Sequence, residues 1–153
     1  MHLLKRSRIL SLQLGTAFAL AAFVPTSQAA LGGDAAAFAT EQTLFGATFT
    51  VTKSDGFSIH ELTTPSGARI RQFVGASGQV FAVAWDGPVL PNLEALLGSS
   101  YTAYVDAQRQ RGRGVHIQTP ALVLESAGMM RAFFGKALLP DRLPANVSAR
   151  DIQ

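Results

Sequence analysis

The fold is decided by the stretch Ala68-Arg-Ile-Arg-Gln-Phe-Val-Gly-Ala-Ser-Gly-Gln-Val-Phe-Ala-Val-Ala-Trp-Asp-Gly-Pro-Val-Leu-Pro91. Its composition and its Gly-bounded turn predict two β-strands, over residues 69–74 and 79–85. The second strand is apolar on both faces, so it belongs in the centre of a sheet that is covered on both sides. Strict alternation places Val80, Ala82 and Ala84 on one face and Phe81, Val83 and Trp85 on the other.

Two further strands precede this stretch. Residues 47–53 alternate between apolar residues and threonines, and residues 57–63 return after the turn Ser54-Asp55-Gly56. A second turn over residues 64–67 leads into the third strand, so the four strands form an antiparallel meander. The residues expected to point inward are Ala47, Phe49, Val51, Phe57 and Ile59, and those expected to point outward include Ser58 and His60.

Helical patterns flank the meander. Asp34 is a suitable N-cap for a helix over residues 35–45, and Asn92 for a short helix that buries Leu93, Leu96 and Leu97. Ser100 caps a second helix, which ends near Arg111 and carries Tyr101, Tyr104 and Val105 on its inner face.

The C-terminal third predicts more strands. Residues 115–118 and 121–125 are short strand candidates, and Ser126-Ala127-Gly128 is interpreted as a turn. Residues 129–139 fit a strand or a helix, and we favour a strand because Gly135 disfavours a helix. Residues 141–153 are expected to be a loosely held tail. The expected fold is α+β: an antiparallel β-meander of about four strands with packed helices and a C-terminal strand pair, in one domain over residues 30–140.

The first 29 residues match an export signal. Lys5, Arg6 and Arg8 form a basic start, residues 9–24 are apolar, and Ser27-Gln28-Ala29 offers small residues for cleavage after Ala29. The alternative is an uncleaved membrane anchor, but the apolar run is shorter than the roughly 20 residues that span a bilayer. We therefore expect export through the inner membrane, to the periplasm or the extracellular space, and no membrane span after cleavage.

Charge and cysteine content exclude several classes of protein. Three of the thirteen Lys and Arg residues lie in the signal and none of the ten Asp and Glu residues, so the remaining 124 residues are formally neutral. A neutral domain has no global field to attract nucleic acid or an anionic membrane. The chain contains no cysteine, which excludes disulfides and thiolate metal sites.

Five segments resemble a family of small exported bacterial proteins, catalogued as domain of unknown function 2844. They are Leu31-Gly-Gly-Asp34, His60-Glu-Leu-Thr-Thr-Pro-Ser-Gly67, Val80-Phe-Ala-Val-Ala-Trp-Asp-Gly-Pro88, Pro91-Asn-Leu-Glu-Ala-Leu-Leu-Gly98 and Met130-Arg-Ala-Phe-Phe-Gly-Lys-Ala-Leu-Leu-Pro140. The resemblance covers nearly all of the chain after the signal. It implies export and a single domain, and it carries no functional residues or mechanism.

Four residues are candidates for binding. Arg69 and Arg71 share one strand face, which indicates either an anion-binding face or a solvated face with pairing to Glu61. Trp85 and Asp86 end the central strand, and the Trp is either a ligand platform or, as we favour, a core residue beneath the helix over residues 93–97.

Catalytic and metal-binding patterns are weak. His60 and His116 lie far apart without a ligand motif, so we expect no metal, and there is no Gly-x-Ser-x-Gly sequence. Asp86 and Glu125 would suit glycan cleavage only if the fold brought them together. The segment Arg109-Gln-Arg-Gly-Arg-Gly114 is interpreted as the end of a helix rather than a nucleic-acid contact, and an anionic envelope surface remains an alternative partner.

These observations predict an exported (periplasmic) non-enzymatic accessory or binding protein without a cofactor. Its expected partner is an envelope protein or a small ligand. The alternatives are a small periplasmic enzyme whose site is assembled only in three dimensions, and a structural envelope protein.

Overall fold

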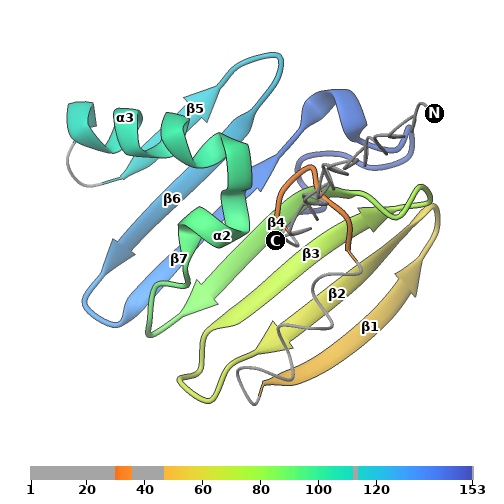
Figure 1. The fold of residues 1–153 in the computed structure, drawn as a ribbon, viewed down its shortest axis with the longest axis horizontal. Coiled ribbons are helices and arrows are strands. Elements are labelled where there is room, and N and C mark those ends of the chain that lie inside the picture. The colour runs from red at the N-terminus through yellow and green to blue at the C-terminus, as the bar shows by residue number, and fades with distance from the viewer. Residues whose placement is uncertain (1–29, 36–46, 112–113, 153) are drawn as a thin grey trace, which may run out of the picture.

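The computed structural model describes residues 30–35, 47–111 and 114–152, and within them seven strands form one antiparallel sheet (Figure 1). The order across the sheet is β1-β2-β3-β4-β7-β6-β5, so β4 is central. The strands are β1 (Thr48–Ser54), β2 (Phe57–Thr63), β3 (Arg69–Gly75), β4 (Val80–Gly87), β5 (Val115–Gln118), β6 (Val123–Met129) and β7 (Ala132–Leu138). The predicted α+β class is confirmed, but the expectation of about four strands and a C-terminal pair undercounts the sheet.

The helical elements of the described residues follow β4. They are α2 (Leu93–Leu97), the 3-10 turn η1 (Gly98–Ser100), α3 (Tyr101–Arg111) and the 3-10 turn η2 (Pro140–Arg142). The Asn92 side chain accepts a hydrogen bond from the backbone N–H of Ala95 at 3.1 Å, which confirms the predicted N-cap. The expected signal over residues 1–29 and all but the first residue of the expected helix over residues 35–45 lie outside the described residues.

The meander β1 to β4 has the predicted hairpin connections. Ser54 pairs with Phe57 across Asp55 and Gly56, and Gly56 has φ +80°, the conformation that the Asp-Gly pair was expected to supply. The expected turn at residues 126–128 is wrong, because these residues lie inside β6. Gly128 faces Phe133, whose ring occupies the space of a side chain at position 128. The β6–β7 turn falls instead at Met130 and Arg131.

A β-bulge changes which side chains of β4 point to each face. Phe73 lies opposite Ala82 and Val74 lies opposite Val80, so Phe81 is an extra residue without a partner on β3. One inserted residue reverses the alternation of a strand, so the faces expected for Val80 and Phe81 were wrong. One face carries Val80, Val83 and Trp85, and the other carries Phe81, Ala82 and Ala84.

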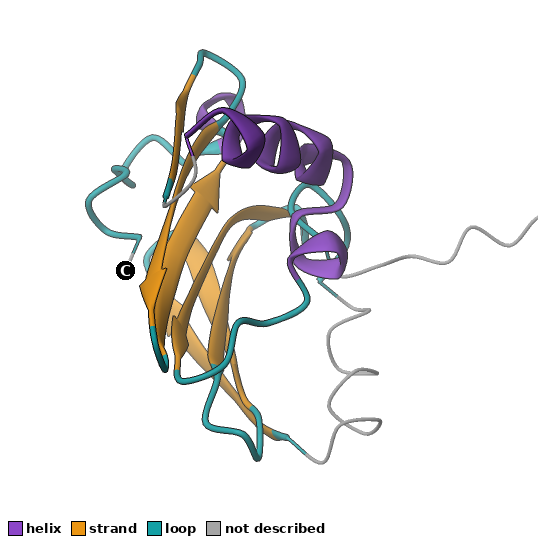
Figure 2. Cartoon of the chain, turned by 90° about the vertical axis from the view of Figure 1, so that its left-hand side faces the viewer, coloured by secondary structure: helices purple, strands orange, loops and turns teal. Residues whose placement is uncertain are grey.

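Both faces of the sheet are covered, as the apolar β4 predicted (Figure 2). The helix face packs against α2 and α3, and its buried cluster includes Trp85, Leu97 and Leu124. The tail face lies under the C-terminal residues, and its cluster includes Phe73 and Ile152. Helices on one side of the sheet and a segment without regular structure on the other give a three-layer arrangement.

The first two strands do not divide into one buried and one solvent face. Val51 pairs with His60, His60 pairs with Gln72, and Gln72 pairs with the buried Val83, so these four side chains share one face of the sheet. His60 therefore points to the helix face, and the expectation that it points outward was wrong. The side chains expected inward are split between the two faces, and Val51 remains 46% exposed. Phe57 and Ile59 pack with the tail-face cluster.

The C-terminal residues differ from the expected loose tail. Ile152 is completely buried, and Leu143 and Val147 pack against the same cluster. The Asn146 side chain donates a hydrogen bond to the carbonyl of Asp55 at 2.8 Å. The loose tail was expected because this segment is largely polar, but its three apolar side chains cover the sheet face opposite the helices.

Candidate ligand-binding groove

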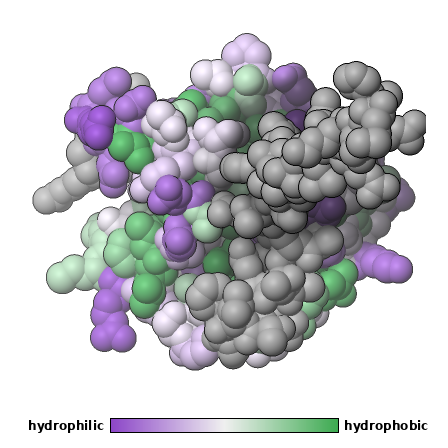
Figure 3. Space-filling view, viewed as in Figure 1, coloured by the Kyte–Doolittle hydropathy of each residue, from purple (hydrophilic) through white to green (hydrophobic). Residues whose placement is uncertain are grey.

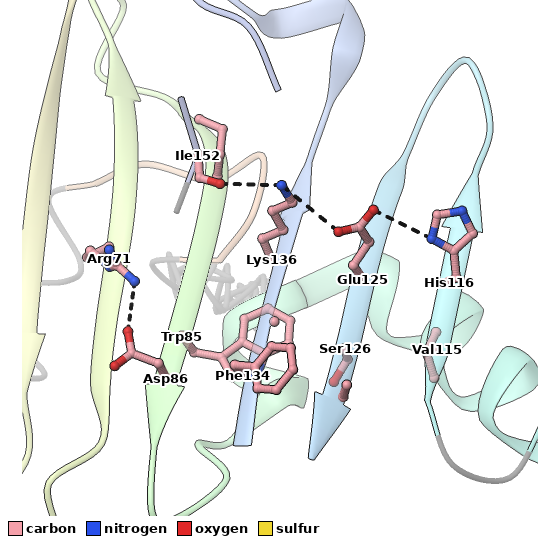
Figure 4. A pocket seen from close by; sticks show the side chains of 12 residues that line it. Arg71, Trp85, Asp86, Val115, His116, Glu125, Ser126, Phe134, Lys136 and Ile152 are labelled. Carbon is pink, nitrogen blue, oxygen red and sulfur yellow. Dashed lines mark hydrogen bonds and ion pairs between the residues drawn. The ribbon is translucent and has the colours of Figure 1, made fainter. Parts of the chain in front are cut away.

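A groove of about 470 Å³ opens on the tail face (Figure 4). Five neighbouring strands, in the order β3, β4, β7, β6 and β5, contribute to its lining. Ile152 of the C-terminal segment also lines the groove. The side chains that give the groove its chemical character are Arg71, Asp86, His116, Glu125, Phe134 and Lys136.

The strand register aligns most of these side chains in one row. His116 lies opposite Glu125, and Glu125 lies opposite Lys136. Lys136 lies opposite Ala84, which in turn lies opposite Arg71. Cross-strand partners in a sheet share a face, so the row presents His116, Glu125, Lys136 and Arg71 on the tail face, with Ala84 between the two basic residues.

Asp86 holds two arginines at one end of the groove. Its Oδ2 accepts hydrogen bonds from Arg69 Nη2 at 2.9 Å and Nε at 3.2 Å, and its Oδ1 accepts one from Arg71 Nη2 at 2.7 Å. The hydrogen bond to Asp86 and the charge of that carboxylate raise the pKa of Arg69. Asp86 therefore fixes the direction of both guanidinium groups, and the pairing to Glu61 considered above is not their main contact.

Glu125 and Lys136 form a looser cluster at the other end. Glu125 Oε1 lies 3.6 Å from His116 Nδ1, and Glu125 Oε2 lies 3.9 Å from Lys136 Nζ. Lys136 Nζ also donates to the carbonyl oxygens of Ala149 at 3.3 Å and Ile152 at 3.5 Å. The lysine thus ties the C-terminal residues to the floor of the groove.

Phe134 supplies an apolar wall. Its side chain is 57% exposed, although it lies in the strand next to the central one. Phe134 lies opposite Asp86, and Figure 4 shows its ring between the Asp86 end and the Glu125 end of the groove. An exposed aromatic ring flanked by charged groups is a common composition of a ligand site.

The structure places the four candidate binding residues as follows. Arg69, Arg71 and Asp86 form one ion-paired group, and Asp86 shares the groove with Glu125. Trp85 is only 1% exposed and belongs to the core cluster that contains α2, although it also lines the groove.

Sequence reasoning missed His116, Lys136 and Phe134 as groove residues. The signal that would have found them is non-local, because it depends on β4 pairing with β7 rather than with β5, the next strand in the chain. Within the described ranges, no group of three or more His, Cys, Asp and Glu side chains is placed to hold a metal ion. None of the helices in that same part of the chain is long and apolar enough to cross a membrane.

The fold and the groove define a single-sheet α+β protein with helices on one face and a charged groove on the other. The chain belongs to the family described as "Protein of unknown function (DUF2844)", whose model matches residues 27–152. This confirms the resemblance seen in the sequence. No curated protein and no solved structure matches the chain.

Proposed function

We propose that the protein is an exported, non-enzymatic binding protein whose small polar ligand lies in the groove on the tail face. The observation that carries the proposal is the alternation of Arg71, Asp86, Lys136 and Glu125 around the exposed ring of Phe134. Such a site offers hydrogen-bond donors and acceptors together with an apolar surface.

The charge balance of the groove indicates the type of ligand. Two basic and two acidic side chains line it, in addition to His116, so neither sign dominates. A ligand with both donors and acceptors, such as a zwitterion, would satisfy them better than a simple anion would. The ion pairs hold the side chains in position before the ligand arrives, which reduces the ordering cost of binding.

The binding proposal can be tested by titrating the protein with amino acids and dipeptides while recording backbone amide NMR spectra. We expect a compound that binds to shift the backbone amide signals of β4, β6 and β7. Phe134→Ala and Glu125→Gln should each weaken its binding about tenfold. Val51→Ala, which changes an exposed apolar side chain on β1 outside the groove, should leave the affinity unchanged. A compound that binds all three variants equally would refute the groove as the site.

Export is the second part of the proposal. It is supported by the basic start, the apolar run and the cleavage sequence. Intact-mass analysis of the chain recovered from a bacterial periplasmic extract should show Ala30 as the first residue. An Ala29→Leu variant should accumulate uncleaved. Recovery of the wild-type chain only in the cytoplasmic fraction, at full length, would contradict export.

A hydrolytic function is favoured by one observation. His116 Nδ1 faces the Glu125 carboxylate at 3.6 Å, an arrangement in which a carboxylate orients an imidazole for proton transfer. If this function is correct, screening with chromogenic ester and glycoside substrates should reveal an activity that His116→Gln abolishes. An activity that survives in His116→Gln would exclude this role for the pair.

A further inference from the structure

The hairpin between β6 and β7 projects beyond its neighbours in the sheet. The β4–β7 pairing ends at Gly87 and Phe133, and the β5–β6 pairing ends at Val115 and Ser126. The hairpin itself continues to the pair Met129 and Ala132. Its tip, residues 129–132, therefore has no neighbouring strand on either side within the described sheet.

The tip is unusually apolar for an exposed turn. Met129 is 81% exposed and Met130 is 96% exposed, the two highest exposures among the large hydrophobic residues that the structure describes. Soluble proteins rarely place adjacent large apolar side chains at a projecting tip without a function.

A second apolar loop lies beside this hairpin. Val89 and Leu90, between β4 and α2, are 47% and 39% exposed. Leu90 lines a small hollow together with Gly128 and Phe133 of the hairpin, so the two loops adjoin. Hydrophobic side chains gather over this part of the molecule, at the lower left of Figure 3.

The outer part of the hairpin carries charge of one sign. Residues 127–134 read Ala-Gly-Met-Met-Arg-Ala-Phe-Phe and contain one arginine and no acidic residue. Arg131 has φ +63°, the only positive φ at a non-glycine residue among the described residues. A glycine or asparagine would adopt this conformation at lower cost, so the arginine occupies this position against its local preference.

We propose that residues 129–131, with Val89 and Leu90 beside them, dock the protein onto an anionic lipid membrane. Apolar side chains that project from a turn can enter the interface between headgroups and acyl chains, and a basic residue next to them is attracted to anionic headgroups. The tip projects beyond the neighbouring strands, and its few apolar side chains expose on the order of a few hundred Å². A stable protein interface needs roughly 800 Å² from each partner, so a lipid surface fits the tip better than a protein does.

The test uses the chain from Ala30 to Gln153, which contains every strand and core cluster described above and lacks the apolar run of residues 9–24, which would itself bind lipid. Co-sedimentation is measured with vesicles of phosphatidylglycerol and phosphatidylethanolamine, and with vesicles of phosphatidylcholine alone. We expect binding to the first kind and at least several-fold weaker binding to the second. The double change Met129→Ser and Met130→Ser should reduce the partition coefficient about tenfold or more.

Two further variants separate the contribution of the Arg131 charge to membrane binding from that of the exposed apolar side chains. Arg131→Gln should lower binding to the anionic vesicles about fivefold and have little effect on phosphatidylcholine. Val51→Ser, which removes an exposed apolar side chain at the opposite edge of the sheet, should bind as the wild type does. Because the chain lacks cysteine, a dye on Met130→Cys should shift to the blue on binding, and a dye on Val51→Cys should not.

Three results would overturn the proposal. The first is a wild-type chain that fails to sediment with anionic vesicles, and the second is a double serine variant that sediments as well as the wild type. The third is capture of a protein partner that requires Met129 and Met130 in the absence of vesicle binding, which would assign the tip to a protein interface instead.

Discussion

The indole ring of Trp85 lies on Gly135 of the adjacent strand, in the space that a side chain at position 135 would occupy. A Cβ at Gly135 would also approach the carbonyl oxygen of Glu125 to 2.6 Å. The glycine is therefore required by packing, since it lets the largest buried side chain of the protein cross from β4 over β7. This contact joins the core under α2 to the strand that carries Phe134 and Lys136.

Gly135→Ala should destabilise the protein by about 1–3 kcal/mol, because the added methyl group overlaps the indole ring and a backbone carbonyl. Chemical denaturation would measure the loss. Gly75→Ala is the matched control in a strand, since its nearest contact would be an ordinary 3.8 Å from the Phe81 ring. Equal stability of the two variants would contradict the proposed packing.

Trp85→Ala should cost about 3–5 kcal/mol, because the side chain is 1% exposed and its removal leaves a cavity. Unfolding followed by circular dichroism avoids the lost fluorescence of the only tryptophan. Phe134→Ala removes an aromatic ring that is 57% exposed, and it should cost less than about 1 kcal/mol. If Trp85→Ala retained wild-type stability, Trp85 would be a ligand platform rather than a core residue.

Ile152→Ala should destabilise the protein by about 2–5 kcal/mol, and Ile152→Val by about 0.5–1.5 kcal/mol, because the side chain is fully buried against the sheet. Thermal or chemical unfolding measures these losses of stability. A larger loss for Ile152→Ala than for Ile152→Val would show that the C-terminal residues are part of the domain. Two variants with wild-type stability would restore the expectation of a loosely held tail.

His60 should make stability depend on pH on the acidic side. Burial lowers the pKa of His60 below its ordinary value of 6.5, so the unfolded chain binds this proton more tightly than the folded protein does. The contribution of His60 is complete above about pH 6.5 and is lost as the pH falls below it. Unfolding free energies measured between pH 7.5 and 5 should decline more steeply for the wild type than for His60→Gln. Parallel curves would show that His60 titrates alike in both states.

The groove illustrates why part of this protein could not be predicted. Arg69 and Arg71 were recognised as candidates because they share a strand face, and Asp86 because it ends the central strand. The ion pairs that join both arginines to Asp86 across β3 and β4 were not predicted. Glu125 was considered only as a possible partner of Asp86, and His116 and Lys136 were not linked to it. The antiparallel pairing of β7 with β4 brings them together, and no local pattern specifies that choice.

The sequence by itself determined the features whose physical causes lie within a few residues: the Asp55-Gly56 hairpin, the Asn92 cap, the apolar character of β4, and the pattern on which the proposed export rests. Only the tertiary structure decided the bulge at Phe81, the burial of Ile152, the neighbours of β4 and the groove to which five strands contribute. These features arise from packing between segments that are distant in the chain. Their free energy depends on which surfaces meet, and local hydrophobic patterns leave that choice open.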